Sequence, residues 1–150
     1  MPAPKPESIS LYRLIHQDNL EILLRRGALH APNFTPDDGL SYKTIHNPNI
    51  QKSRNSFNIP CGPKGTCHDY VPFYFGPLAP MLLQLHTGQV KGYTDKQSHL
   101  IYLVANFQQF AAAGLNWAFS DGHGIARFTS WYASVDNLNK VDWNTVPIRY

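Results

Sequence analysis

The chain has 150 residues, of which 43% are hydrophobic, and its formal net charge is +3. A chain of this length suits one domain with a real core, because it buries roughly 70% of its unfolded surface. The mild basic excess permits a polyanionic partner without requiring one. No apolar run approaches the roughly 20 residues of a membrane span and no secretory signal is recognisable, so we expect a cytoplasmic protein without membrane contact. Residues 1–9 are interpreted as a proline-rich leader and residues 10–150 as the domain.

The first part of the domain combines a strand, a helix and a long irregular segment. Ser10 to Ile15 alternates β-forming residues and predicts a strand. The next helix is expected to begin at Asp18, which has a glutamate three residues later in capping-box spacing, and to end at Gly27. From Ala31 to Cys67 no periodicity persists, and only a short helix near residues 49–55 is expected. An irregular stretch of this length inside a compact domain is usually functional.

The second part interleaves short strands and helices. Runs rich in β-branched and aromatic residues predict strands at residues 71–75, 100–104 and 117–119. Apolar residues at helical spacing predict helices at residues 77–87, 106–113 and 125–132. Residues 135–150 are expected to be irregular. The interleaved short elements and the long loop favour an α+β fold over a parallel doubly wound sheet.

Several common catalytic signatures are absent from the sequence. It contains no phosphate-binding G-x-x-x-x-G-K, no G-x-G-x-x-G after a strand and no G-x-S-x-G elbow. Its two glutamates, Glu7 and Glu21, argue against a paired-glutamate hydrolase. Cys61 and Cys67 are expected to be free thiols. A small metal-dependent enzyme built on these cysteines and the histidines remains a distant alternative, because their spacing fits no common zinc site.

Three short segments gather side chains suited to ligand binding. Arg13 to His16 ends the first strand at the start of a helix, a position that favours a pyrophosphate, although an ordinary helix cap has the same appearance. Gln51 to Arg54 places basic residues on a turn, as a solvated basic face also does. Thr66 to Phe75 places a histidine, an aspartate and two tyrosines beside aromatic residues, which more often belong to a core than to a stacking surface. None of the three segments identifies a reaction alone.

Taken together and in this order, the segments resemble the DarT family. The matching patterns are R-x-I-H-x-D-N-L from Arg13, I-Q-x-x-R ending at Arg54, and H-D-Y-V-P-F-Y-F from His68. The last block is the most specific, because eight consecutive positions include several aromatic residues and a proline. Later blocks that look like the family lie at residues 101–104, 112–115, 119–123 and 141–143. DarT proteins are toxins of DarT–DarG toxin–antitoxin systems, and they ADP-ribosylate single-stranded DNA.

The resemblance implies an ADP-ribosyltransferase fold, which is a split β-sheet with flanking helices and a cleft that binds NAD⁺. NAD⁺ would be the co-substrate, no metal would be needed, and a base of single-stranded DNA would attack the ribose. Thymine is the base in the better-known branch of the family, with guanine as the alternative. The resemblance also implies a DarG-like macrodomain antitoxin as partner, and we expect a monomer. Positioning and electrostatics carry most of such a reaction.

The family's functional residues map onto this chain position by position. The implied NAD⁺ contacts are Arg13, Leu14, Ile15, His16, His30 and Arg54. The implied substrate cleft consists of His68, Asp69, Tyr70, Tyr74 and His123. The loop from about Asp38 to Ser56 matches the NAD⁺-binding element of the family. Arg54 matches the catalytic arginine, and because arginine side chains stay protonated, we expect it to orient the base or the phosphates rather than act as a base.

The catalytic glutamate of the family has no counterpart in this chain. In the family it lies beyond the block at residues 141–143, and no glutamate follows Glu21 here. We therefore expect a domain that is C-terminally incomplete, through deliberate shortening or as a natural remnant, with little or no catalysis. A non-catalytic module that keeps the NAD⁺ or DNA cleft is the alternative. Should the chain be active, Asp121 or Asp142 would be the candidate carboxylate.

Overall fold

The computed structural model describes residues 3–78, 80–95 and 97–146, and it confirms a mixed fold of short antiparallel sheets with helices. The strands β1 (Ser10–His16) and β2 (Leu100–Asn106) pair antiparallel along their whole length. On the other edge of β1, the backbone groups of Tyr12 and Tyr74 exchange two hydrogen bonds of 2.8 Å. A second small sheet pairs β3 (Phe119–Ser120) with β4 (Trp131–Tyr132). The β-structure is therefore divided between two separate sheets.

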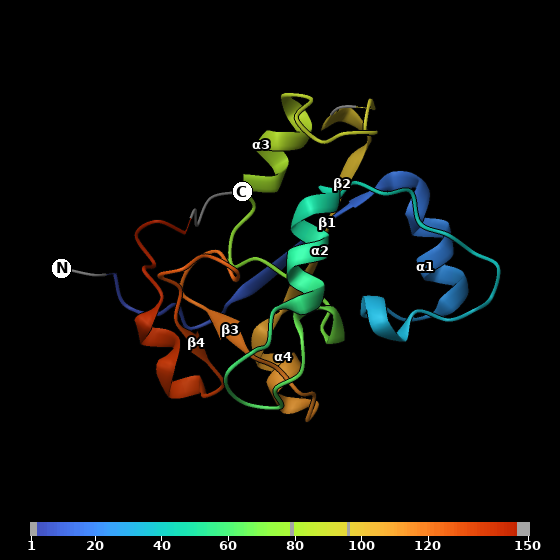
Figure 1. The fold of residues 1–150 in the computed structure, drawn as a ribbon. Helices are drawn as coiled ribbons and strands as arrows, with labels where there is room; N and C mark the ends of the chain where they lie inside the picture. The colour runs from blue at the N-terminus through green and yellow to red at the C-terminus, as the bar shows by residue number, and fades with distance from the viewer. Residues whose placement is uncertain (1–2, 79, 96, 147–150) are drawn as a thin grey trace.

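The described residues form four α-helices. They are α1 (Leu20–Arg26), α2 (Pro48–Ser56), α3 (Pro80–His86) and α4 (Phe107–Ala112). Figure 1 shows α1 and the β3–β4 hairpin on opposite sides of the molecule, with α2 between them in this view. No helix in the described part of the chain is long and apolar enough to cross a bilayer.

The turn between β1 and α1 differs from the prediction in its cap. A 3₁₀ turn, Gln17–Asn19, precedes the helix, and the Nδ1 atom of His16 accepts a hydrogen bond of 3.1 Å from the N–H group of Asp18. Asp18 therefore donates through its backbone instead of capping with its carboxylate. The predicted end is confirmed, because Gly27 follows the helix with a φ of 66°, which favours glycine.

Two predicted elements are wrong. Residues 71–75 form no strand, and only Tyr74 makes an isolated bridge. Pro72 in this segment has no N–H group to donate, and its carbonyl accepts from Arg13. Residues 125–132 form no helix, because Asp121 accepts from the N–H group of Ser130 at 2.8 Å and closes a turn that leads into β4. The other helices near 49–55 and 106–113 are confirmed as α2 and α4.

The remaining boundaries shift modestly. The helix expected from Pro77 begins at Pro80, and the strand expected over 117–119 begins at Phe119. The segment expected to be irregular contains a 3₁₀ helix, Val135–Lys140, and its last residues, 147–150, lie outside the described residues.

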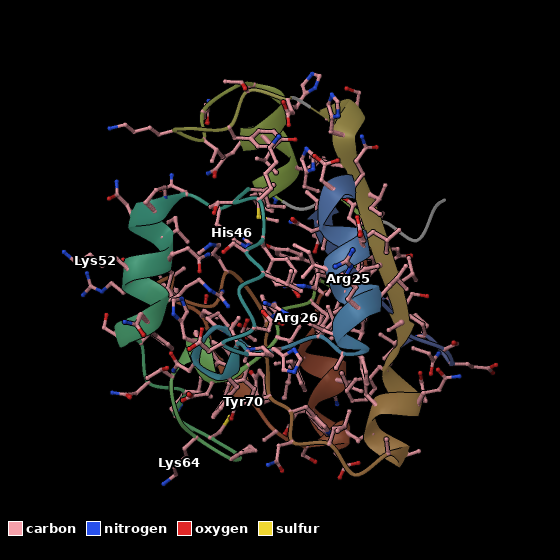
Figure 2. All side chains as sticks on the ribbon, turned by 90° about the vertical axis from the view of Figure 1, so that its right-hand side faces the viewer. Arg25, Arg26, His46, Lys52, Lys64 and Tyr70 are labelled. Carbon is pink, nitrogen blue, oxygen red and sulfur yellow. The ribbon has the colours of Figure 1, made fainter. Side chains whose placement is uncertain are left out.

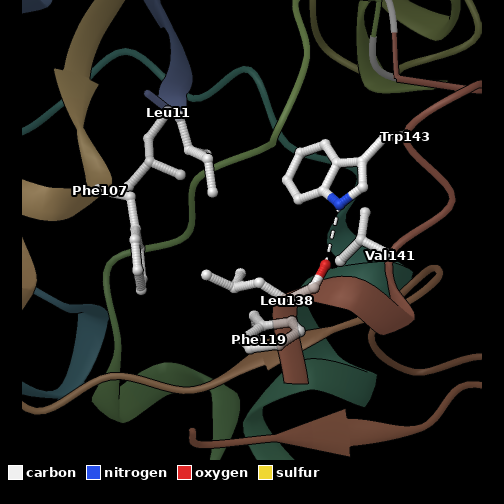
Figure 3. Packing of buried hydrophobic residues seen from close by; sticks show 7 residues of the cluster. Leu11, Phe107, Phe119, Leu138, Val141 and Trp143 are labelled. Atoms are coloured by element: carbon white, nitrogen blue, oxygen red, sulfur yellow. Dashed lines mark hydrogen bonds between the residues drawn. The ribbon is translucent and has the colours of Figure 1, made fainter. Parts of the chain in front are cut away.

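Two apolar clusters hold the fold together. The larger, shown in part in Figure 3, consists of Ile9, Leu11, Phe107, Phe119, Leu138, Val141 and Trp143. The smaller consists of Leu14, Ile45, Leu85, Val90 and Tyr93. Leu11 and Leu14 lie on opposite faces of β1, since neighbouring side chains of a strand alternate, so this strand contributes to both clusters. Ile9 is 2% exposed, so the last residue of the segment assigned to the leader belongs to the core.

Candidate functional site

A cavity of about 1110 Å³ lies beside β1, α2, α4 and the β3–β4 hairpin. Its wall is mostly apolar, with rings from Phe73, Phe110, Trp117 and Trp131, and a few polar groups converge on it, as in many ligand sites. Of the site residues predicted from sequence, those that line it are His30, Arg54, Asp69, Tyr70, Tyr74 and His123. Those that do not line it are Arg13, Leu14, Ile15, His16 and His68.

The inner face of α2 explains the spacing of the I-Q-x-x-R pattern. Asn47 caps the helix by accepting from the N–H group of Asn49 at 3.0 Å, and Pro48 occupies the first turn. Residues three apart share a helix face, so Gln51 and Arg54 lie together. Gln51 is hydrogen-bonded to His68 Nε2 at 3.1 Å, and Arg54 lines the cavity. His68 thus supports α2 from behind the cavity wall.

Two arginines bring positive charge to this wall. Arg13 donates from Nη1 to the carbonyl of Pro72 at 3.1 Å, while its buried Nε has no hydrogen-bond partner. Burial lowers the pKa of Arg13, and the nearby charge of Arg54 lowers it further. The guanidinium charge of Arg54 on the cavity wall, with the charge of Arg13 close to it, is suited to an anionic ligand. The Nδ1 atom of His30, on the cavity wall, is also buried without a partner.

His46 does not line the cavity but lies close to Arg13 and Arg54, and sequence reasoning missed it. It immediately precedes the cap of α2, and Figure 2 shows it on the inner side of that helix, whereas Lys52 points outward. Burial lowers the pKa of His46 to about 4, and the charges of Arg13 and Arg54 add to the effect. The imidazole is therefore neutral near pH 7 and offers one donor and one acceptor between the two cations.

The carboxylates that line the cavity are already hydrogen-bonded to donors of the protein. Asp69 accepts from Asn33 at 2.8 Å and from the N–H group of Thr66 at 2.7 Å. These bonds, the one from Asn33 first, lower the pKa of the Asp69 carboxyl. Asp121 accepts from the Ser130 N–H group and from a tyrosine hydroxyl, and Asp142 accepts from a backbone N–H group two residues later. These carboxylates therefore stabilise the wall of the cavity.

His16 is fully buried, which conflicts with a direct contact of its side chain with NAD⁺. Its Nδ1 accepts from the backbone of Asp18, so its proton lies on Nε2, which donates to Asp95 at 2.9 Å. Its ring stacks on His99 with 5.6 Å between the ring centroids. The side chain of His16 therefore joins the end of β1 to the segment that carries Asp95.

The same cluster brings His16, Asp95 and His99 within 4.8 Å of one another, yet it does not fit a metal ion. A metal-bound histidine uses a nitrogen without a proton, whereas the nitrogen of His16 that faces Asp95 carries one. Lys43 also donates to the same oxygen of Asp95, and this bond raises the pKa of the lysine. Cys61 and Cys67 are free thiols, as predicted, and no candidate metal cluster among the described residues includes them.

The first part of the predicted NAD⁺-binding loop is attached to α1 and to the turn before it at two points. Arg26 donates from Nε and Nη2 to the two oxygens of Asp38, both at 2.8 Å, and to the carbonyl of Leu40 at 2.9 Å. The buried side chain of Asn19 accepts from the N–H group of Lys43 at 2.7 Å and donates to its carbonyl at 2.9 Å. Asn19 thus clamps the loop, and it is the asparagine of the R-x-I-H-x-D-N-L pattern, which was therefore the sequence signal for this attachment.

Comparison with known proteins agrees with this geometry. Residues 12–150 match the family model described as "ssDNA thymidine ADP-ribosyltransferase, DarT". A DNA ADP-ribosyl transferase of Thermus sp. (strain 2.9) is 36% identical over 97% of this chain and 68% of its own length. The described fold is thus that of a DNA ADP-ribosyltransferase family. The chain belongs to the DarT family.

Solved structures of the Thermus sp. 2.9 protein have the same fold. Its DarT in complex with ADP-ribosylated single-stranded DNA has a TM-score of 0.87 and 35% identity over 96% of this chain. Its complex with NAD⁺ has a TM-score of 0.80 and 34% identity over 94% of this chain. The chain covers 67% and 65% of these two structures, and therefore spans about two thirds of the length of its relatives.

Proposed function

We propose that this chain binds NAD⁺ and single-stranded DNA, and that it is the cofactor-binding part of an enzyme that transfers ADP-ribose to thymidine. The observation that carries the proposal is the placement of Arg54 on the cavity wall beside Arg13, whose buried Nε has no partner. Membership of the family supports it, as do the similar structures solved with NAD⁺ and with ADP-ribosylated DNA.

NAD⁺, when bound, would supply the ADP-ribosyl group. The nicotinamide–ribose bond would break with its electron pair leaving on nicotinamide, the base nitrogen would bond to the same ribose carbon, and the proton lost by the base would pass to solvent. Arg54 binds and orients anionic groups, because guanidinium ions hold phosphates with paired hydrogen bonds, and Arg13 adds positive charge close to it. Arg54, which reaches the cavity, orients the attacking base. His46 is neutral, so it adds no charge of its own near the phosphates. The apolar rings of the wall exclude water from the reacting atoms.

We further propose that these 150 residues transfer ADP-ribose only at a near-background rate. Glu7 and Glu21 lie outside the cavity lining, and Glu21 is paired with Arg25 at 2.6 Å on the surface of α1. The lining aspartates accept hydrogen bonds from donors of the protein. Without a carboxylate free to stabilise the positive charge that develops on the ribose, the rate falls by on the order of 10²–10³.

The family role supports three further proposals. The protein is a monomeric toxin, it acts in the cytoplasm where its DNA substrate lies, and a DarG-like macrodomain antitoxin is its partner. Analytical ultracentrifugation of the chain alone and with a macrodomain protein tests the monomer and the partner together. A dimer, or the lack of a complex, overturns the corresponding proposal.

Calorimetric titration with NAD⁺ tests the cofactor site. We expect weak binding by the unaltered chain, and at least tenfold weaker binding by Arg54→Ala, since a guanidinium that contacts phosphate is lost. Lys52→Ala, on the exposed side of the same helix, is the matched control and should bind NAD⁺ normally. Both variants should stay within about 0.5 kcal/mol of the original stability, as surface changes do. If no heat of binding is measured at millimolar NAD⁺, the chain has no formed NAD⁺ site and the proposal is wrong.

Transfer itself is tested with a thymidine-containing oligonucleotide and labelled NAD⁺. Near-background labelling is expected, and a non-catalytic binding module predicts the same result with retained NAD⁺ and DNA affinity. Robust labelling contradicts the proposed lack of activity and makes Asp121 or Asp142 the catalytic carboxylate. Loss of labelling in Asp121→Asn or Asp142→Asn then identifies which one.

A further inference from the structure

We infer that two adjacent turns at the edge of the cavity, residues 61–65 and 121–130, form a rim that binds the nucleotides flanking the target base. In this arrangement Lys64 and Arg127 contact phosphates, and Phe128 stacks on a neighbouring base. The inference rests on the proposed binding of single-stranded DNA and adds the path of the strand to it.

The first turn holds Lys64 in a conformation that lysine rarely adopts. Its φ is 62°, in the left-handed region that favours glycine, and such a residue costs about 1–3 kcal/mol. A bridge between Asn58 and Thr66 and a hydrogen bond of 2.8 Å from Ile59 N–H to the Gly65 carbonyl close the turn. The hydroxyl of Tyr70 donates to the carbonyl of Lys64 at 2.5 Å. The surrounding structure therefore holds a lysine at the cavity edge at an energetic cost.

The second turn is equally well fixed and carries an exposed ring. Thr129 donates from Oγ1 to the carbonyl of His123 at 2.6 Å, and Trp131 donates from Nε1 to the carbonyl of Gly124 at 3.0 Å. Phe128 is 92% exposed, and the guanidinium carbon of Arg127 lies 5.7 Å from the centroid of its ring. A phenyl ring and a cation presented together on a firm turn are suited to stacking with a nucleobase.

The first turn packs against the residues that follow the second turn, so the two turns lie next to each other at one edge of the cavity. A Cβ atom placed on Gly62 would lie 2.7 Å from the Cβ of Ala133, directly after β4. Phe57 stacks on Trp131 with 5.9 Å between the ring centroids. Lys64, His123, Gly124 and Trp131 line the cavity, so the rim borders the proposed site of transfer.

The positive charge of the rim makes an anionic strand the ligand that fits it. Neither Lys64 nor Arg127 forms an ion pair with any residue that the structure describes. The nearby carboxylates of Asp69 and Asp121 are hydrogen-bonded to donors within the protein. Cations beside an exposed aromatic ring are the usual means of binding single-stranded nucleic acid, in which phosphates meet cations and bases stack.

Fluorescence anisotropy with a labelled, thymidine-containing 12-mer tests the inference on the intact chain. Phe128→Ala should weaken binding by about ten- to one-hundredfold, the usual effect of losing one base-stacking ring. Phe128→Trp should restore it. Leu24→Ala is the matched control, because Leu24 is 73% exposed on α1 and outside the cavity lining, and it should bind normally.

Salt dependence tests the phosphate contacts separately. Each lost contact should reduce the slope of log affinity against log salt by about 0.7 for a single strand. Lys64→Gly removes the charge and also relieves the left-handed backbone, so weaker DNA binding cannot be ascribed to unfolding. Arg127→Ala should have a similar effect on the slope. Binding of thymidine monophosphate should be unchanged in all these variants, since the rim contacts only flanking nucleotides.

The possible results separate this inference from the proposed function. Normal oligonucleotide affinity and salt slope in Phe128→Ala and Lys64→Gly overturn the rim and leave DNA binding intact. A chain that binds NAD⁺ but no oligonucleotide overturns both the DNA part of the proposed function and the rim. Equal loss of thymidine monophosphate and oligonucleotide binding places Phe128 at the target base and also overturns the rim.

Discussion

Lowering the pH from 7 to 5 should destabilise this protein through His46. The folded protein keeps the pKa of His46 at about 4, because of burial and the charges of Arg13 and Arg54, whereas an unfolded chain has the ordinary value near 6.5. Between these values the unfolded state binds a proton that the folded state excludes, so stability falls as the pH falls. The difference of about 2.5 pKa units corresponds to about 3 kcal/mol in total, of which about 2 kcal/mol is lost by pH 5.

Urea unfolding at pH 7, 6 and 5 measures this effect. His46→Gln lacks the titrating group and should lose about 2 kcal/mol less than the original protein between pH 7 and pH 5. The carboxylates of Asp38 and Asp69 have lowered pKa values, caused first by Arg26 and Asn33 respectively, so their contribution disappears mainly below this window. Equal pH dependence in His46→Gln and the original protein would refute the buried, neutral state of His46.

Two further substitutions test the architecture around the site. Asn19→Ala removes both bonds to the backbone of Lys43, and it should cost about 1–3 kcal/mol in urea unfolding and weaken NAD⁺ binding in calorimetry. Gly62→Ala meets both a φ of 60° and a Cβ contact at 2.7 Å, and it should lower the melting temperature more than Gly39→Ala. Gly39 has a similar φ of 72° with nothing within 4 Å, so equal effects would contradict a contribution from the contact.

Local signals in the sequence predicted local structure. Gly27 ends α1 with a positive φ, and Asn106 caps α4 by accepting from the N–H group of Gln109, as their residue types suggest. The short helix expected near residues 49–55 is α2, and it brings Arg54 to the wall of the site. These features depend on residues a few positions apart, which a sequence displays directly.

Features that depend on distant partners were not predictable in this way. His16 has the residue type and sequence position of a ligand contact. Its side chain is instead buried and hydrogen-bonded to Asp95, which lies 79 residues later in the chain. The sequence that ends at Trp131 and Tyr132 predicted a helix. These two residues instead form β4, which pairs with β3 across a turn that Asp121 closes. His46 titrates abnormally because of two arginines from other elements. Tertiary contact outweighs local propensity at all three places.

The pairing of β1 with β2 has a consequence for the order in which the chain can fold. The N–H group of Ile9, next to β1, donates to the side chain of Gln108, 99 residues later, at 3.2 Å. During synthesis at about 5–20 residues per second, β1 therefore waits roughly 5–20 seconds before its partner strand exists. In that interval Leu11 and the edge of β1 that later pairs with β2 are available to other chains. The nascent protein is thus most exposed to aggregation before Asn106 emerges, and helix α1 with its clamped loop is the part that can form first.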